Sequence, residues 1–388
     1  MANSRPLCEK TELCGGCTYQ CISYENQLIE KLNAAKEALR LNEIDDSILT
    51  EIIPSPDMYG YRNKMEYTFG DEVIGGPMNL GMHKKGSYIS IIDASTCQLV
   101  PEDFNKVLKI TRDWCETQGY SFYHKKRHEG LLRSLIVRKG FRTNELLINI
   151  VTSSEIGFDE EAYKNLLLST NFDSNIVGIL HTINDNVADA LKVDGLNILY
   201  GRDHYFEEIL GLKFKVGAFS FFQSNVVAAE RLYKAALELL PDLSGKTVYD
   251  LYCGTGTISQ AMALKAKEVY GVEIVEEAVE AAKVNAKLNN LSNCDFICGD
   301  VLKTLDEIEK KPDVIVVDPP RSGIHPKAMK MICAYDVPEI VYVSCNPKTL
   351  AINLKSCMEE GYQPVKMQCF DNFAFTSHTE AVCLLRKM

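Results

Sequence analysis

The chain has 388 residues, of which 46% are hydrophobic, and carries a formal net charge of −11. This length and composition predict a globular protein of two or three domains with a sizeable buried core. No run of about 18 apolar residues predicts a membrane span, and the polar start MANSRPLCEK lacks the regions of a signal peptide, so we expect a cytoplasmic protein. The acidic balance excludes indiscriminate binding to polyanions, so any contact with nucleic acid would need a local basic patch.

A cysteine cluster opens the chain. Clustered cysteines in a reducing compartment point to metal, whereas isolated ones point to packing or catalysis. The stretch CEKTELCGGCTYQC contains Cys8, Cys14, Cys17 and Cys21. The Gly15-Gly16 pair allows a tight turn that directs Cys14 and Cys17 at one centre, and either Cys21 or Cys97 can complete a set of four. Four thiolates suit both zinc and an iron–sulfur cluster, and their spacing alone does not choose between these.

The next segments predict a helix and then a strand-rich domain. Residues 24–41 have the pattern of an amphipathic helix, and residues from about 52 to 215 form a separate, strand-rich substrate domain. Within it, HKKRHEGLLRSLIVRKGFR (124–142) has seven Lys or Arg and one Glu, which predicts a strand pair with one basic face, and Phe141 offers a stacking surface. Arg62 and Lys64 mark a second candidate contact with nucleic acid.

A cofactor motif follows. GKTVYDLYCGTGTISQAMALKA (245–266) predicts a strand, a glycine-rich turn and a helix. The next segment predicts a strand that ends at Glu273 and then an amphipathic helix, so the two together form a βαβ unit. A carboxylate about 20 residues after such glycines suits a ribose diol.

Three more predicted strands end in polar or reactive residues, namely Asp300, Asp318 and Cys345. Cys345 follows the apolar run Ile340–Val343 and precedes a helix that begins near Pro347. Because ligands bind at the carboxyl ends of the strands in a doubly wound sheet, this thiol is placed for chemistry.

Several of these motifs resemble one known family. DLYCGTGTI, DPPRSG, SCNPKTL, HTEAVCLL and FSFFQSN resemble motifs of the RNA uracil-5-methyltransferases related to RumA, and the resemblance covers nearly the whole chain, including the CxxxxxCGGC signature. It implies an α/β fold: a Rossmann-like class I methyltransferase domain that uses S-adenosyl-L-methionine, an amino-terminal iron–sulfur motif and a strand-rich RNA-binding central domain. We expect a monomer that acts on RNA, with 23S rRNA favoured over tRNA.

The resemblance also assigns roles to residues. It implies that Cys345 adds to carbon 6 of uracil and that Glu380 is the base that removes the carbon 5 proton. It also implies a 4Fe-4S cluster whose fourth ligand is Cys97, not Cys21. The implied cluster ligands are Cys8, Cys14, Cys17 and Cys97. The predicted cofactor-binding residues are Gln223, Tyr252, Gly254, Thr257, Glu273, Asp300 and Asp318. We expect the helix that begins at Pro347 to favour the thiolate of Cys345.

The expected domains are an iron–sulfur and RNA-binding domain (1–20 and 52–215), a helical segment that packs on the catalytic domain (21–51) and the methyltransferase domain (216–388). Two other functions stay open. A methyltransferase for cytosine carbon 5 or for an exocyclic nitrogen would share the cofactor fold without the pairing of Cys345 and Glu380. An iron–sulfur RNA-binding protein without catalysis would tolerate the loss of Cys345.

Overall fold

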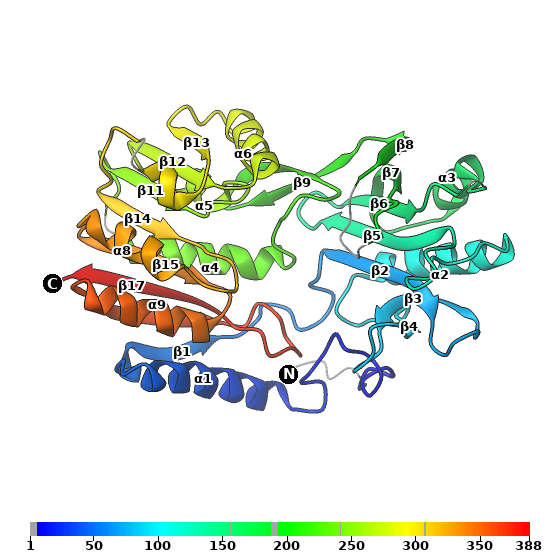
Figure 1. Cartoon of the computed structure of the whole chain (residues 1–388), viewed down its shortest axis with the longest axis horizontal. Coiled ribbons are helices and arrows are strands. Elements are labelled where there is room, and N and C mark those ends of the chain that lie inside the picture. The colour runs from blue at the N-terminus through cyan, green and yellow to red at the C-terminus, as the bar shows by residue number, and fades with distance from the viewer. Residues whose placement is uncertain (1–5, 156, 188–192, 241, 306–307) are drawn as a thin grey trace. The chain divides into compact units, whose positions relative to one another are not determined.

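The computed structural model describes residues 6–155, 157–187, 193–240, 242–305 and 308–388. The chain forms two compact units (Figure 1). The first unit comprises the residues up to Cys21, Asp57–Glu208 and Val216–Phe219, and the second comprises Ile22–Pro56, Ile209–Lys215 and Ser220–Met388. Strands β9 (His204–Ile209) and β10 (Leu212–Gly217) form a two-stranded sheet where the chain passes from one unit to the other.

The second unit is built on an eight-stranded sheet. Its strands lie in the order β1 (Leu49–Ile53), β16 (Tyr362–Phe370), β17 (Glu380–Lys387), β15 (Glu339–Ser344), β14 (Val314–Val317), β11 (Thr247–Leu251), β12 (Glu268–Glu273) and β13 (Cys294–Cys298). All neighbouring pairs are parallel except those that involve β17. The four residues of β14 are all buried, as expected for a central parallel strand covered on both faces. The α/β fold predicted from the sequence is therefore confirmed.

Helices surround this sheet. They are α1 (Tyr24–Leu41), α4 (Val226–Leu239), α5 (Thr257–Ala263), α6 (Glu276–Leu288), α7 (Val301–Thr304), α8 (Pro326–Ala334) and α9 (Pro347–Glu359), with a 3-10 turn at Asp46–Ile48. Helix α9 begins where the sequence predicts, because Pro347 occupies its first turn and the side chain of Asn346 accepts a hydrogen bond from the Lys348 amide at 3.2 Å. From β11 the chain continues to β12 and β13 on one side of the sheet, and it then returns to β14 on the other side of β11. This reversal creates a switch point at the carboxyl ends of the strands.

Helix α1 belongs to the second unit although it comes early in the sequence. It packs beside β1 and α9 (Figure 1) and contributes Ala35, Ala38 and Leu39 to the core of the unit. Lys31 Nζ donates to Asp371 Oδ1 at 2.5 Å, and both side chains are buried. Gln27 Oε1 accepts from the amide of Phe375 at 2.9 Å. Helix α1 thus holds the loop that connects β16 to Glu380.

The first unit is built on a seven-stranded sheet. Its order is β4 (Ile91–Asp93), β3 (Met78–His83), β2 (Lys64–Asp71), β5 (Leu132–Gly140), β6 (Glu145–Thr152), β7 (Asn175–Ile183) and β8 (Gly195–Gly201). Helices α2 (Glu102–Thr117) and α3 (Glu160–Ser169) pack against it and share a core with residues such as Tyr67, Leu135 and Ile148. Among the described residues, we find no helix that combines the length and apolar character needed to cross a membrane.

Candidate active site

Cys345 lies immediately after β15, at the carboxyl edge of the sheet, as the sequence predicts. The amide of Asn346 donates to Ser344 Oγ at 3.1 Å, which shapes the turn around the thiol. Asn346 Nδ2 and Thr349 Oγ1 each donate to the carbonyl of Arg321 at 3.2 Å. The start of α9 is thereby bonded to the loop that follows β14, and the two strand ends form one site.

The thiol of Cys345 is half-buried in an acidic environment. The pKa of this thiol is raised to about 11, chiefly by burial. The carboxyl groups of Glu380 and Asp318 also raise it, and the guanidinium of Arg321 opposes them with a smaller effect. The expectation that the start of α9 favours the thiolate is therefore wrong for the protein alone. Desolvation and two acidic neighbours outweigh the positive end of a helix dipole, whose effect is about 0.3–1 kcal/mol at exposed positions.

The two acidic neighbours also hold their protons tightly. Burial raises the pKa of Glu380 to about 8, with a further rise from Asp318 and an opposing effect from Arg321. Burial raises the pKa of Asp318 to about 7. Arg321 Nη2 lies 3.0 Å from Nδ1 of His378, two residues before Glu380. The site can therefore take up and release protons near neutral pH, which is what general acid–base chemistry requires.

The glycine-rich turn lies at the end of β11. Gly254 has φ +53° and donates its amide to Glu273 Oε2 at 3.0 Å, while Glu273 Oε1 accepts from the Val275 amide at 2.9 Å. A Cβ on Gly256, which has φ +75°, would meet the ring of Phe296 at 2.6 Å, so this position requires glycine. The carboxylate predicted to bind a ribose is thus fixed against the turn.

The other predicted cofactor residues occupy neighbouring loops. Asp300 caps α7 by accepting from the Leu302 amide at 2.9 Å. Burial, with a smaller contribution from the charge of Asp300, raises the pKa of the half-buried Tyr252 to about 12. Thr257 is the first residue of α5. Gln223 Nε2 donates to Tyr233 Oη at 2.9 Å. The roles of these residues in cofactor binding stay predictions.

Sequence reasoning missed Asp250 and Tyr233. Asp250 lies inside β11, is fully buried and accepts a hydrogen bond from Ser259, and burial raises its pKa to about 7. The buried hydroxyl of Tyr233 has a raised pKa because of burial and of the charges of Asp318, Glu380 and Asp250. A carboxylate in the apolar strand TVYDL was a signal available in the sequence, since unpaired buried charges are rare. Nothing comparable marked Tyr233.

In the first unit, the four predicted cluster ligands line one cavity of about 40 Å³. Burial raises the pKa of Cys17 to about 12, and the nearby thiols of Cys97, Cys14 and Cys8 add to this rise. Cys21 is exposed and does not line the cavity. Within the described parts of the chain, no group of three or more His, Cys, Asp or Glu is arranged to hold a metal ion. The four thiols are a chemically suitable donor set for a 4Fe-4S cluster, and their role as its ligands stays a prediction.

The predicted basic face of residues 124–142 needs a correction. Arg138 points inward and is 1% exposed, and it donates to the carbonyls of Gly217 and Ala218. It is therefore not available to nucleic acid. The residues of this segment that reach the surface include Lys126 and Arg127, in the turn before β5.

Comparisons with known proteins agree with this geometry. Residues 160–388 match the model of the tRNA (Uracil-5-)-methyltransferase family. A protein of Clostridium tetani described as an uncharacterized RNA methyltransferase is 48% identical over 374 residues, which cover 96% of this chain and 82% of the relative. A similarly described protein of Caldanaerobacter subterraneus is 49% identical over 374 residues, covering 96% and 83% of the two chains.

A solved structure extends the likeness to three dimensions. The Pyrococcus abyssi tRNA (uracil-54, C5)-methyltransferase, in complex with S-adenosyl-L-homocysteine, matches with a TM-score of 0.79 and 27% identity, covering 99% of this chain and 88% of that one. The resemblance drawn from the sequence motifs is confirmed. The chain therefore belongs to the tRNA (uracil-5-)-methyltransferase family, and its enzyme class is S-adenosylmethionine-dependent RNA (uracil-5-)-methyltransferase.

Proposed function

We propose that this protein methylates carbon 5 of a uridine in RNA through a covalent bond between Cys345 and carbon 6 of uracil. The observation that carries this proposal is the placement of Cys345 beside Asp318 and Glu380, two carboxyl groups whose pKa values of about 7 and about 8 suit proton exchange with a thiol and with carbon 5. Carbon 5 of uracil is a poor nucleophile, so it needs a thiolate at carbon 6 to become an enolate.

The proposed reaction begins when Cys345 passes its proton to the carboxylate of Asp318 and its sulfur bonds to carbon 6, which leaves Glu380 ionised. S-adenosyl-L-methionine supplies an electrophilic methyl group, which carbon 5 takes. The carboxylate of Glu380 then removes the carbon 5 proton, the bond between sulfur and carbon 6 breaks, and the double bond of the base is restored. Arg321, which opposes the negative charge of both Cys345 and Glu380, stabilises the anionic forms.

The cofactor pocket and the cluster are part of the same proposal. The cofactor would lie where β11, β12 and β13 end, surrounded by Tyr252, Gly254, Thr257, Glu273 and Asp300. Gln223 and Asp318 would contact it from the side of β14. Cys8, Cys14, Cys17 and Cys97 would hold a 4Fe-4S cluster in the first unit. The methyl transfer above moves no single electron, so we assign the cluster a structural role.

The first RNA to test is 23S rRNA, with tRNA as the alternative. The sequence motifs resemble those of enzymes related to RumA, which favours 23S rRNA. The names of the solved relative and of the family model both include tRNA, which supports the alternative. Mapping 5-methyluridine in total RNA from a strain that lacks the gene would identify the modified position.

The covalent step has a direct test. Total RNA from that strain, grown with 5-fluorouracil, is incubated with the protein and S-adenosyl-L-methionine. Fluorine at carbon 5 cannot leave as a proton does, so a protein–RNA adduct should survive denaturing electrophoresis. The Cys345→Ala variant should form none, whereas Cys21→Ala, a change at an exposed thiol of the first unit outside the cavity lining, should form as much as the unchanged protein. An adduct with Cys345→Ala would refute the proposed nucleophile.

A further inference from the structure

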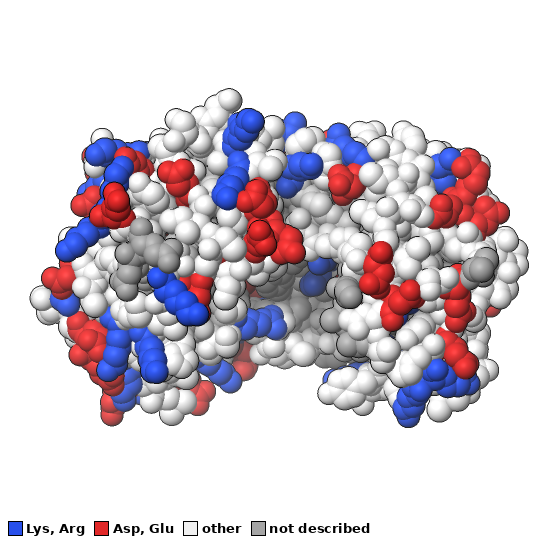
Figure 2. All heavy atoms as spheres, turned by 45° about the horizontal axis from the view of Figure 1, so that its top comes forward, with Lys and Arg blue, Asp and Glu red and all other residues white. Residues whose placement is uncertain are grey.

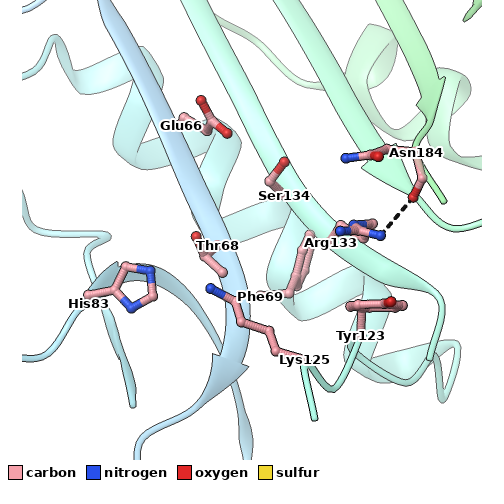
Figure 3. A pocket seen from close by; sticks show the side chains of 9 residues that line it. All are labelled: Glu66, Thr68, Phe69, His83, Tyr123, Lys125, Arg133, Ser134 and Asn184. Carbon is pink, nitrogen blue, oxygen red and sulfur yellow. Dashed lines mark hydrogen bonds between the residues drawn. The ribbon is translucent and has the colours of Figure 1, made fainter. Parts of the chain in front are cut away.

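A polar cavity of about 200 Å³ lies in the first unit, on one face of its sheet (Figure 3). It is lined by Glu66, Thr68, Phe69, His83, Tyr123, Lys125, Arg133, Ser134 and Asn184. Alternation along β2 creates it: Met65 and Tyr67 point into the core, whereas Glu66 and Thr68 point to the other face. Ser134 of β5 pairs with Thr68 and extends the polar lining.

One wall of this cavity is a flat stack. The guanidinium of Arg133 lies 4.1 Å from the ring centroid of Tyr123. Its terminal nitrogens donate to the carbonyls of Asn184 and Asn186, each at 2.8 Å, and these bonds fix the plane of the group. Because those acceptors are neutral, the positive charge of Arg133 still attracts anions.

The remaining groups are placed at separate ends. Lys125 and Glu66 lie toward opposite ends of the lining, with Thr68 and Ser134 between them (Figure 3). A cation at one end suits a phosphate, and a carboxylate at the other accepts hydrogen bonds from an amino group. Figure 2 shows Lys and Arg interspersed with Asp and Glu on the face that it draws, so attraction of a polyanion to that face depends on local groups.

These features match the way in which proteins recognise unpaired RNA, with bases stacked on aromatic or arginine planes and hydrogen-bonded along their edges. A cavity of about 200 Å³ is smaller than the pockets of roughly 300–1,000 Å³ that take drug-sized ligands, so it has room for a single base with its phosphate outside. A carboxylate accepts a hydrogen bond from the exocyclic amino group of cytosine, adenine or guanine, whereas uracil has no amino group and its carbonyl oxygens repel a carboxylate.

We propose that this cavity binds one nucleotide of single-stranded RNA whose base carries an exocyclic amino group, and that this nucleotide is distinct from the uridine to be methylated. Glu66 accepts from the amino group, Lys125 and Arg133 attract the adjoining phosphate, and the plane of Arg133 and Tyr123 forms the wall. This inference rests on the proposed function, because the bound nucleotide belongs to the RNA that the enzyme methylates.

The test measures binding without catalysis. Fluorescence anisotropy of labelled 12-nucleotide oligomers of cytidine, adenosine and uridine is followed with the full-length protein. We expect the cytidine and adenosine oligomers to bind at least about fivefold more tightly than the uridine oligomer. Glu66→Ala should bring the three affinities within about twofold of one another, because it removes the acceptor that discriminates between the bases.

Two matched variants serve as controls. Glu116→Ala changes an exposed carboxylate on α2 outside the cavity and should preserve the base preference. Lys125→Ala should weaken binding of all three oligomers about three- to tenfold, whereas Lys106→Ala, a change at an exposed lysine on α2 outside the lining, should stay within about twofold of the unchanged protein. Thermal melts check that each variant is folded.

Three results would overturn the site: equal affinities in the unchanged protein, a base preference that survives Glu66→Ala, or equal losses for Lys125→Ala and Lys106→Ala. None of these depends on methyl transfer. Base-selective binding by a protein that forms no fluorouridine adduct would therefore refute the reaction and leave the site standing, and the opposite result would do the reverse.

Discussion

The thiols of the two units share one cause of a raised pKa and differ in the second. Burial disfavours the thiolate at both Cys17 and Cys345. Around Cys17 the further effect comes from other thiols, whereas around Cys345 it comes from the carboxyl groups of Glu380 and Asp318. Thiolates that face one another repel, so they need a positively charged metal ion or cluster between them. A thiol beside carboxylates can instead pass its proton to them. The neighbours, more than the pKa, distinguish the predicted metal ligand Cys17 from the proposed nucleophile Cys345.

Replacing the proton acceptor gives the largest expected effect. Glu380→Gln should lower turnover by about 10²–10⁴-fold, the usual contribution of a general base. Because addition and methylation precede the step assigned to Glu380, adduct should accumulate on ordinary RNA. Transfer of labelled methyl groups and denaturing electrophoresis measure the two quantities. Glu359→Gln, a change at an exposed position on α9, is the control, and normal turnover by Glu380→Gln would remove this residue from the mechanism.

The thiols of the first unit can be separated by their metal content. Cys97→Ser should lower the iron bound after anaerobic purification as strongly as Cys14→Ser, with loss of visible absorbance. Cys21→Ser should keep its iron, because Cys21 is exposed and lies outside the cavity lining. Full iron in Cys97→Ser together with loss in Cys21→Ser would show that the ligand assignment is wrong.

The smallest expected effect concerns the titration of Cys345. Its alkylation by iodoacetamide, followed by peptide mass spectrometry, should increase with pH toward a midpoint of about 11. In that range Glu380 is ionised, since its pKa is about 8, and its negative charge opposes the thiolate. The neutral side chain in Glu380→Gln removes this repulsion, so the midpoint should move to lower pH. The exposed Cys298 is an internal reference, and an unchanged midpoint for Cys345 would contradict the electrostatic coupling.

Local patterns predicted much of the catalytic unit. Apolar runs with polar ends predicted the strands that end near Glu273, Asp318 and Cys345, and the sheet brings these ends to one edge because the strands are parallel. Helix α1 likewise occupies the residues expected from its periodicity. These features depend on short-range patterns that burial reinforces.

Features that depend on distant segments escaped prediction. Burial raises the pKa of Cys345 most, and the carboxyl groups of Glu380 and Asp318, which other strands bring close, raise it further. The burial of Arg138 depends on Gly217 and Ala218, whose carbonyls replace water around its guanidinium. A charge count along the chain cannot reveal such partners, so Arg138 was counted with the surface cations.

The pairing of β1 with β16 determines when the second unit can be completed. Residues Leu49–Ile53 are made early on the ribosome, but their partners Met367–Phe370 are made near the end. At about 5–20 residues per second the first strand waits roughly 15–60 s. The first unit, complete by Phe219, can fold during that interval, while the apolar side of α1 has no sheet to cover it. The apolar side of α1 therefore stays exposed in the newly made chain until β16 and β17 emerge.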